Sequence, residues 1–324
     1  MDNFNLKTCG AAAFLILSTA VLSAAELRLG IVGTDTSHVG AFTKMLNDPA
    51  APGHIAGAKV VAAYKGGSPD IESSRSRIEK FTQELRDKYQ VRMFDSIPEM
   101  CKRVDAVLIE GVDGRVHLEQ ARQVIAAHKP FFIDKPLAST LEDAREIGRL
   151  AKAAGVPWFS SSSLRFNGVA KLRTPDLEGA LTWGPGPFEE HHHLELSWYA
   201  IHPIEMLYTL MGQGCEQVTR IAGGNADLIV GRWKGGRIGT IRALRPYGNY
   251  GAVAFRPGPA KNKAQITEIF SDPSDGYAPL VKEIVKFFET GTPPVSNAET
   301  LEMFAFMDAA QRSKEAGGQP MTLR

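Results

Sequence analysis

The feature that most constrains the fold is a regular alternation of short β-rich runs with helical patterns between residues 27 and 160. Strands that alternate with helices in this way form a parallel, doubly wound sheet. The sequence therefore predicts an α/β fold that begins with a Rossmann-type βαβ unit, whose ligand crevice lies at the carboxyl ends of the strands. We expect strands in six runs: LRLGIVG, AKVVAAY, VRMF, VDAVLIEG, KPFFID and VPWFS.

The pattern changes after SSSSLRF, and we place a domain boundary near residue 160. Later segments, HHHLELS among them, have the pattern of strands joined by Gly and Pro turns, as in antiparallel sheets. Two amphipathic helices close the chain. The expected organisation is a signal peptide over residues 1–25, a Rossmann domain over 26–160, and an α+β domain over 161–324 with an open, mainly antiparallel sheet.

The N-terminus has the pattern of a secretory signal peptide. Lys7 precedes the apolar run CGAAAFLILSTAVLSA, and Ser23-Ala24-Ala25 are small residues of the A-x-A type. The apolar run is shorter than the ~20 residues of a spanning helix, so cleavage after Ala25 is favoured over an uncleaved anchor. We therefore expect an exported protein, periplasmic or secreted, with no membrane attachment after cleavage.

Charge and cysteine content limit the possible partners. The formal net charge is +1 with no basic block, which disfavours nucleic acid and favours a small-molecule ligand. Removal of the signal peptide would also remove Cys9 and leave Cys101 and Cys215, which lie far apart in the sequence. A disulfide between them is possible but not implied.

The stretch GIVGTDTSHV, residues 30–39, begins like a nucleotide-binding glycine loop. In the G-x-G-x-x-G fingerprint, Gly33 fills the first position, but Asp35 fills the second and His38 the third. A carboxylate facing a pyrophosphate is repulsive, although the helix N-terminus still offers an anion site. Asp35 either caps this helix or, like His38, contacts a ligand. The candidate cofactor-binding residues here are Gly33, Thr34, Asp35, Thr36, Ser37 and His38.

The end of the second expected strand departs from the fingerprint as well. Tyr64 and Lys65 stand where an acidic residue normally binds the adenosine ribose. Lys65 either pairs with a 2′-phosphate, which would favour NADP, or is a surface lysine. Taken alone, the surface interpretation is favoured.

The run from GVDGRVH to SSSSLRF resembles the glucose-fructose oxidoreductase/inositol dehydrogenase/MocA (Gfo/Idh/MocA) family. Members carry Glu-Lys-Pro at the end of the fifth strand, and Asp134-Lys135-Pro136 matches it with a conservative Asp. The resemblance implies that Lys135 lies beside the nicotinamide and the substrate hydroxyl, where a lysine can hold or donate a proton. Asp134 and Arg165 join the candidate cofactor-binding residues.

A helix is expected in IHPIEMLYTLMG, because Pro203 suits its first position, with His202 at the cap and Gly212 after its end. Its expected buried stripe is Ile204, Leu207, Tyr208 and Met211. The family carries an Asp and, four residues later, a His that acts with the lysine. His202 matches this histidine, but Trp198 replaces the aspartate. Glu205 either substitutes for that aspartate or completes a capping box, and the cap is favoured.

The histidine run 191–193 resembles a metal site in its residue types. Neighbouring side chains of a strand point to opposite faces, so at most His191 and His193 share one. With His202 or Glu205 they could bind zinc or manganese, but the spacing is not that of metal ligands, and no metal is predicted. Lining of a substrate pocket is favoured. The candidate substrate-binding residues are His193, Trp198, Tyr199 and Glu205.

Two functions follow from these observations. The first is an oxidoreductase with tightly bound NAD or NADP that acts on a sugar, cyclitol or glycoside, with Lys135 and His202 as catalytic residues. A recycled cofactor, as in glycosidase or lyase chemistry, suits an exported enzyme without a nicotinamide pool. The alternative is a cofactor-free carbohydrate-binding or metal-assisted protein on the same fold, which the departures at Asp35, His38, Tyr64-Lys65 and Trp198 favour. The resemblance also implies a homo-oligomer, a dimer or tetramer formed through the open sheet.

Overall fold

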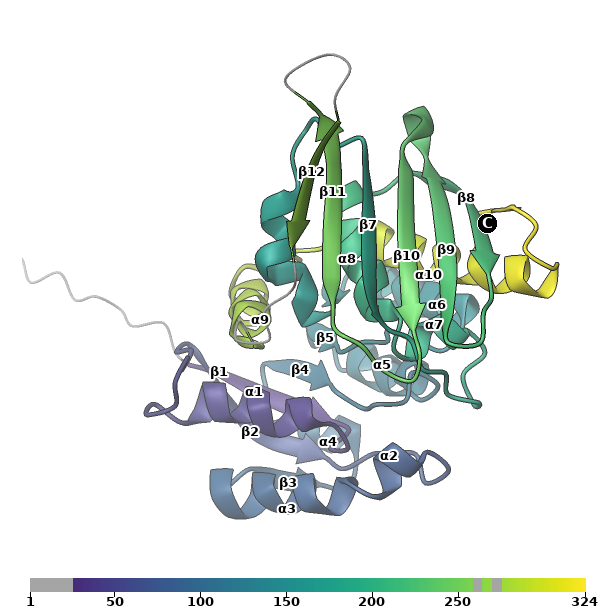
Figure 1. Ribbon diagram of the computed structural model, residues 1–324. Coiled ribbons are helices and arrows are strands. Elements are labelled where there is room, and N and C mark those ends of the chain that lie inside the picture. Colours follow the sequence, from purple (N-terminus) through teal and green to yellow (C-terminus); the bar gives the residue numbers. More distant parts are fainter. Residues whose placement is uncertain (1–25, 259–263, 270–275) are drawn as a thin grey trace, which may run out of the picture.

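The computed structural model describes residues 26–258, 264–269 and 276–324, so the expected signal peptide lies outside the described residues. The chain forms two sheets, and Figure 1 shows the first below the second. None of the helices in the described ranges has the length and hydropathy needed to cross a bilayer.

The first sheet has six parallel strands in the order β3-β2-β1-β4-β5-β6, which confirms the predicted Rossmann arrangement. β1 lies at the point where the strand order reverses, the place where such folds bind their ligands. Its strands are β1 (Leu27–Val32), β2 (Ala58–Tyr64), β3 (Arg92–Phe94), β4 (Ala106–Ile109), β5 (Phe131–Ile133) and β6 (Trp158–Ser160).

Helices connect these strands much as the sequence predicts. At the start of α6, Thr140 Oγ1 accepts a hydrogen bond from the Asp143 N–H at 3.0 Å, and Gly155 follows its end with φ 65°. Two helices follow β2, and the Ser76 hydroxyl donates to the Glu72 carbonyl where the first of them, α2, ends. The helices are α1 (Ser37–Asn47), α2 (Glu72–Arg75), α3 (Ile78–Tyr89), α4 (Ile97–Cys101), α5 (His117–Ala126) and α6 (Leu141–Ala154).

The second sheet has the order β12-β11-β7-β10-β9-β8-β13. Its neighbours are antiparallel except β7 and β10, so the predicted open, mainly antiparallel sheet is confirmed. β11 is not among the strands expected from the sequence. The strands are β7 (Gly179–Pro185), β8 (Cys215–Ile221), β9 (Ala226–Trp233), β10 (Ile238–Leu244), β11 (Gly251–Pro257), β12 (Ala264–Ile269) and β13 (Met321–Thr322).

The strand expected in HHHLELS is wrong. Residues 189–194 form turns, and α7 (Glu195–Trp198) follows. The Leu194 N–H donates to the Ser139 carbonyl at 3.1 Å and the Ser197 hydroxyl to the Leu194 carbonyl at 2.7 Å. These local bonds satisfy the backbone without a sheet neighbour.

Helix α8 (Ile201–Met211) is buried on every side, not only along the expected stripe. It packs between β7 and β10 and the short 3₁₀ helices η1 (Ser163–Phe166) and η2 (Gly168–Leu172). The helix begins before His202, with Ala200 at the cap position, so the expected cap at His202 is wrong. Gly212 follows its end as predicted.

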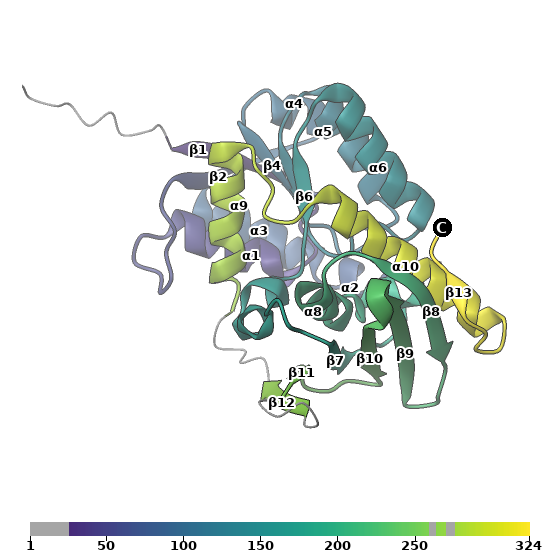
Figure 2. The ribbon, with the colours of Figure 1, turned by 90° about the horizontal axis from the view of Figure 1, so that it is seen from above.

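The two closing helices join the sheets. α10 (Asn297–Glu315) lies between α6 and β8, and α9 (Ala278–Thr290) returns to the first sheet and packs beside α1 (Figure 2). Apolar side chains of α9 share a core with those of β1, β5 and β6. The later half of the chain therefore completes the core of the first sheet.

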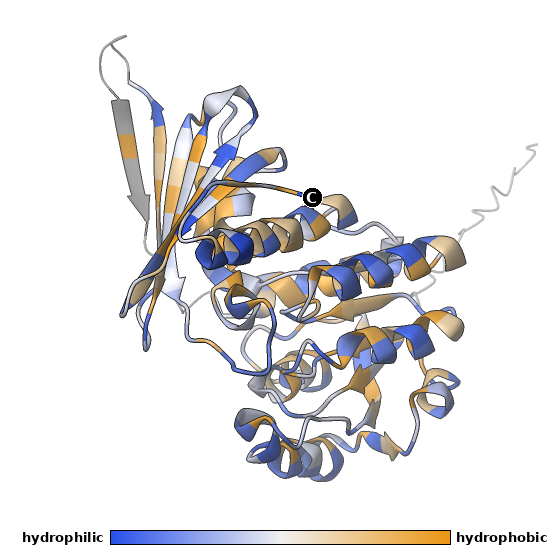
Figure 3. Ribbon diagram, turned by 90° about the vertical axis from the view of Figure 1, so that its right-hand side faces the viewer, coloured by the Kyte–Doolittle hydropathy of each residue, from blue (hydrophilic) through white to orange (hydrophobic). Residues whose placement is uncertain are grey.

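Among the described residues, helices cover one side of the second sheet and leave the other side open (Figure 3). On its outer side, Leu228 and Ile238 are exposed apolar residues, and Ile221 and Ile266 are also exposed in this sheet. The cysteines Cys101 and Cys215 are buried free thiols, and burial raises their pKa to about 11 and about 12.

Candidate functional site

The turn between β1 and α1 requires glycine at its first position. Gly33 has φ 86°, and a Cβ there would lie 2.6 Å from the Gly111 backbone nitrogen. The next residue, Thr34, is buried, with its hydroxyl 2.6 Å from the Thr82 hydroxyl. The turn is therefore packed tightly against the loop that follows β4.

Asp35 is buried in this turn and does not cap α1. Its Oδ2 accepts from the Ser74 hydroxyl at 2.6 Å, and its Oδ1 accepts from the Val112 N–H at 3.0 Å. The capping interpretation is wrong, because the carboxylate is bonded to the segments after β2 and β4 instead. The cap position of α1 belongs to Thr36, whose buried hydroxyl has no hydrogen-bond partner among the described residues. Ser37 is exposed at the start of the helix.

His38, at the third fingerprint position, reaches across to the end of β5. Its Nδ1 lies 2.6 Å from Asp134 Oδ2. The ring stacks on Phe42 with centroids 5.5 Å apart and meets the Tyr277 ring edge-on at 4.5 Å. Burial acts to raise the pKa of Asp134, but His38 and Lys135 together hold it below its usual value.

Lys135 and His202 belong to the same group of side chains. Lys135 Nζ lies 5.8 Å from the centroid of the Tyr199 ring, and the His202 ring lies 5.4 Å from it. His202 Nδ1 lies 2.7 Å from the Ser162 hydroxyl oxygen. Burial and the charges of Lys135 and His38 lower the pKa of His202 well below its usual value. The fold thus brings together two residues that sequence analysis selected from opposite halves of the chain.

Tyrosines that sequence analysis did not select complete this group. Between ring centroids, Tyr247 lies 5.8 Å from Tyr199, and Tyr250 lies 5.6 Å from His202. Both Tyr247 and Tyr250 lie in the loop between β10 and β11. Burial and Tyr247 raise the pKa of Tyr199 to about 12. The signal in the sequence was RPYGNY, an aromatic-rich turn beside an unrecognised strand.

Glu110 is a second residue that sequence analysis missed. It follows β4, is fully buried, and both of its carboxyl oxygens lack hydrogen-bond partners among the described residues. Burial, together with the charge of Asp134, raises its pKa well above its usual value. The available signal was an acidic residue at the carboxyl end of a buried parallel strand.

Glu205 and Arg165 form a buried ion pair. Glu205 Oε1 accepts hydrogen bonds from Arg165 Nε and, at 2.9 Å, from the Ser161 hydroxyl. Arg165 Nη1 also donates to Glu299 at 2.6 Å. The capping box expected for Glu205 is wrong, because its carboxylate is held by side chains of other elements.

The histidine run does not share a strand face, since it lies in a turn. His192 is the buried member: its Nε2 lies 3.1 Å from Asp113 Oδ1, and its ring meets that of Trp198 at 5.0 Å. His191 pairs with Glu189 at 2.6 Å, and His193 is exposed. Within the described residues, no group of three His, Cys, Asp or Glu side chains could hold a metal ion.

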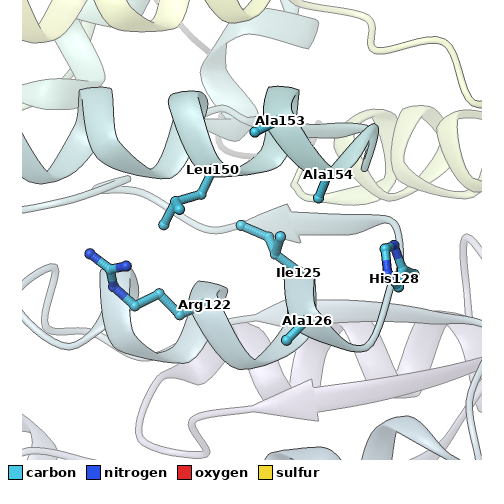
Figure 4. Close-up of a pocket in the computed structure, with 7 residues that line it drawn as sticks. All are labelled: Arg122, Ile125, Ala126, His128, Leu150, Ala153 and Ala154. Atoms are coloured by element: carbon cyan, nitrogen blue, oxygen red, sulfur yellow. The ribbon is translucent and has the colours of Figure 1, made fainter.

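Two features lie outside this group. Lys65 is half-exposed and pairs with Glu79. A pocket of about 460 Å³ between α5 and α6 is lined by apolar side chains, with Arg122 and His128 also contributing (Figure 4). None of the residues predicted for the site lines this pocket.

Comparison with known proteins identifies relatives of this arrangement. Residues 27–161 match the family GFO_IDH_MocA, described as the oxidoreductase family with an NAD-binding Rossmann fold. Inositol 2-dehydrogenase of Paracoccus denitrificans (strain Pd 1222) is 32% identical over 133 residues, which are 40% of this chain. The match spans only 34% of that relative's length.

Solved structures agree over nearly the whole chain. An oxidoreductase from Agrobacterium radiobacter, in complex with NAD+, L-tartaric acid and magnesium, has a TM-score of 0.70 at 15% identity and covers 92% of this chain and 98% of its own. The myo-inositol dehydrogenase from Lactobacillus casei, in complex with NAD(H) and myo-inositol, has a TM-score of 0.70 at 15% identity, with 92% and 97% covered. At these identities the similarity shows the fold.

Proposed function

Because residues 27–161 match the NAD-binding Rossmann fold of the Gfo/Idh/MocA oxidoreductase family, we propose that this protein oxidises or reduces a carbinol carbon of a sugar, cyclitol or glycoside with NAD or NADP. The observation that carries the proposal is that Lys135 Nζ and the His202 ring both lie beside the Tyr199 ring, 5.8 Å and 5.4 Å from its centroid. The two residues come from opposite halves of the chain, and the charge of Lys135 acts on the buried imidazole. Relatives that bear the names of inositol dehydrogenases support a polyhydroxylated substrate.

The residues at the carboxyl edge of the first sheet fit a dinucleotide. Thr36 Oγ1, both Glu110 carboxyl oxygens and Asp134 Oδ1 are buried polar atoms that lack partners among the described residues. The start of α1 has backbone N–H groups that no side chain caps, and such a helix end binds phosphate. The Asp35 carboxylate is already bonded to Ser74 and Val112, so it has partners of its own. Thr36, Ser37 and Asp134 would hold the cofactor.

The side chains have separate tasks in the proposed reaction. A bound nicotinamide supplies the hydride acceptor or donor. Lys135 donates a hydrogen bond to the carbinol oxygen and stabilises the negative charge that develops there. His202 is uncharged, because its pKa is lowered, and bonds the same oxygen while Ser162 fixes its ring. The rings of Tyr199 and its neighbours orient the substrate, as aromatic walls of small-molecule sites do.

The proposal also covers the location and the assembly of the enzyme. We propose export by a cleaved signal peptide over residues 1–25, and a tightly held cofactor that is recycled in place suits that location.

We also propose a dimer or tetramer formed through the outer side of the second sheet, which the exposed Leu228 and Ile238 support. Light scattering of the purified protein and of Ile238→Glu would test the assembly: a wild-type monomer would contradict it.

A cofactor-free carbohydrate-binding protein is the second candidate. The observation that favours it is the occupation of two fingerprint glycine positions by Asp35 and His38, both held by bonds within the chain.

One experiment separates the candidates. The mature protein is purified and denatured, and NAD(H) and NADP(H) are assayed in the supernatant. Bound nucleotide, or a thermal shift on adding it, supports the oxidoreductase, and turnover is then measured with myo-inositol and a panel of sugars and glycosides. Lys135→Ala and His202→Ala are expected to abolish turnover with the fold retained. Absence of nucleotide, thermal shift and turnover would leave the binding protein as the function.

A further inference from the structure

His38 and Asp134 form a histidine–carboxylate pair inside the candidate site. The position of His38 belongs to a glycine in the dinucleotide fingerprint, so its imidazole is an addition to the usual loop. Its Nδ1 lies 2.6 Å from Asp134 Oδ2, and the Asp134 side chain is 1% exposed. Phe42 and Tyr277 pack against the ring and fix its orientation.

This geometry determines which ring nitrogen is available. When a carboxylate accepts from Nδ1–H, the neutral imidazole keeps its lone pair on Nε2. Nε2 of His38 has no hydrogen-bond partner among the described residues, and 12% of the side chain is exposed. The pair therefore has the arrangement in which a carboxylate orients a histidine as a general base and stabilises the imidazolium that forms.

The two histidines of the site have different neighbours. His202 is bonded to a neutral hydroxyl, and an imidazolium there would lie near the Lys135 charge. An imidazolium at His38 would instead be paired with the Asp134 carboxylate. The titratable and charged groups around His38 are Asp134, Lys135, His202 and Tyr277. The aspartate expected four residues before His202 is Trp198, so that route for the proton is absent.

We propose that the His38–Asp134 pair is a general acid–base dyad of this site, with His38 Nε2 exchanging a proton with the substrate hydroxyl. The inference rests on the proposed function. In the oxidation direction the carbinol C–H electron pair leaves as hydride to the oxidised nicotinamide that the proposed function requires. The O–H proton moves to Nε2, the C=O bond forms, and the imidazolium later releases the proton to water. Reduction runs the same transfers in reverse.

Replacement of His38 by glycine gives the sharpest test, because it restores the fingerprint glycine while removing the imidazole. His38→Gly is expected to keep nucleotide binding and to lose about 10²- to 10⁴-fold in turnover. Added imidazole should restore part of the rate, and a series of substituted imidazoles should rescue according to their pKa. His54→Gly is the matched control: its Nδ1 bonds the Met45 carbonyl at 2.9 Å beyond the far end of α1, and no imidazole rescue is expected.

A second variant and a spectroscopic readout do not depend on His38→Gly being well folded. His38→Asn keeps an N–H donor toward Asp134 without a base, so it should lose turnover together with the ionisation of one imidazole in the pH–rate profile. In the apo protein, ¹⁵N NMR should show His38 as the Nδ1–H tautomer in the wild type, with that signal changed in Asp134→Asn.

The outcomes separate this inference from the function on which it rests. Wild-type turnover in both His38 variants overturns the dyad. Loss of turnover without imidazole rescue, together with an Nε2–H tautomer of His38 in the NMR, also overturns it. Both results leave the oxidoreductase intact. A wild-type protein without nucleotide binding and turnover overturns both proposals.

Discussion

At the scale of single residues, the buried Glu205 carboxylate gives a clear energetic prediction. It is held by Arg165 and Ser161, and its removal would leave the buried Arg165 charge with Glu299 alone. Loss of one partner of a buried ion pair costs about 3–5 kcal/mol, and the remaining carboxylate favours the low end. We expect Glu205→Ala to lower the free energy of unfolding by about 3 kcal/mol, measured by urea denaturation.

The exposed pair of Lys65 and Glu79 provides the control for that measurement. Lys65→Ala removes a solvent-screened interaction and should cost less than about 1 kcal/mol. A loss in Glu205→Ala no larger than in Lys65→Ala would show that the buried pair does not stabilise the fold.

For Glu110, in contrast to Glu205, we expect that removal of the carboxylate stabilises the fold, and that the effect depends on pH. Burial and Asp134 raise its pKa in the folded state, so the folded protein binds this proton more tightly than the unfolded chain does. The stabilisation from binding this proton is complete below the unfolded pKa of about 4.3 and is lost as the pH rises toward the folded value. The glutamine side chain of the variant Glu110→Gln does not ionise, so this variant does not lose stability in this way. The stability advantage of Glu110→Gln should therefore grow with pH above about 4.3, by at most about 1.4 kcal/mol per pH unit.

Urea unfolding of both proteins at three pH values between 4.5 and 8 measures this difference. Glu79→Gln, on the exposed surface, should show no such growth. A stability difference that is constant with pH would contradict the raised pKa of Glu110.

Sequence reasoning at this scale succeeded where a residue type belongs to a motif and failed where its role depends on distant neighbours. The motifs indicate Lys135 and His202, and the structure places both beside the Tyr199 ring. The hydrogen-bond partners of Asp35 lie 39 and 77 residues away in the sequence, and those of Glu205 lie 40 and 44 residues away. The local rule for helix caps therefore misassigned both residues. For Glu110 the sequence shows an acidic residue at the end of a buried strand, but not that both of its carboxyl oxygens lack partners among the described residues.

At the scale of elements, the turn from β1 to α1 depends on Gly33. Its φ of 86° disfavours any side chain, and a Cβ would also press on the Gly111 backbone at 2.6 Å. We expect Gly33→Ala to cost about 2–4 kcal/mol, the sum of backbone strain and overpacking. Gly291→Ala isolates the first contribution, because φ is 70° there and nothing lies within 4 Å of the added Cβ, so about 1 kcal/mol is expected. Equal losses in the two variants, measured by urea unfolding, would contradict the close approach.

The elements themselves were predicted well where periodicity is strong and poorly where it is not. The alternation of strands and helices gave the first sheet, and the cap at Thr140 and the stop at Gly155 set the ends of α6. HHHLELS has the pattern of a strand between Gly and Pro turns, yet local turn bonds hold residues 189–194. β11 was missed because GAVAFRP begins with small residues and ends at proline.

At the scale of the whole molecule, the return of α9 to the first sheet couples the two halves of the chain. Phe287 is fully buried and meets Phe159 of β6 edge-on at 5.0 Å, and its neighbours on α9 share a core with β1 and β5. A second core runs continuously from the first sheet through α8 to the second. Neither half can therefore lose its packing without exposing apolar surface of the other, and we expect a single cooperative unfolding transition.

Phe287→Ala tests this coupling. Truncation of a buried phenylalanine costs about 3–5 kcal/mol, and because the cores are joined the loss should appear in both sheets. Hydrogen exchange measured by mass spectrometry should show faster global exchange in peptides of β5 and β6 and, to the same extent, in peptides of β9 and β10. Lys286→Ala, on the exposed side of the same helix, should change neither. Faster exchange confined to β5 and β6 would mean that the halves unfold separately, since a disturbance of one core would then leave the other at its full stability.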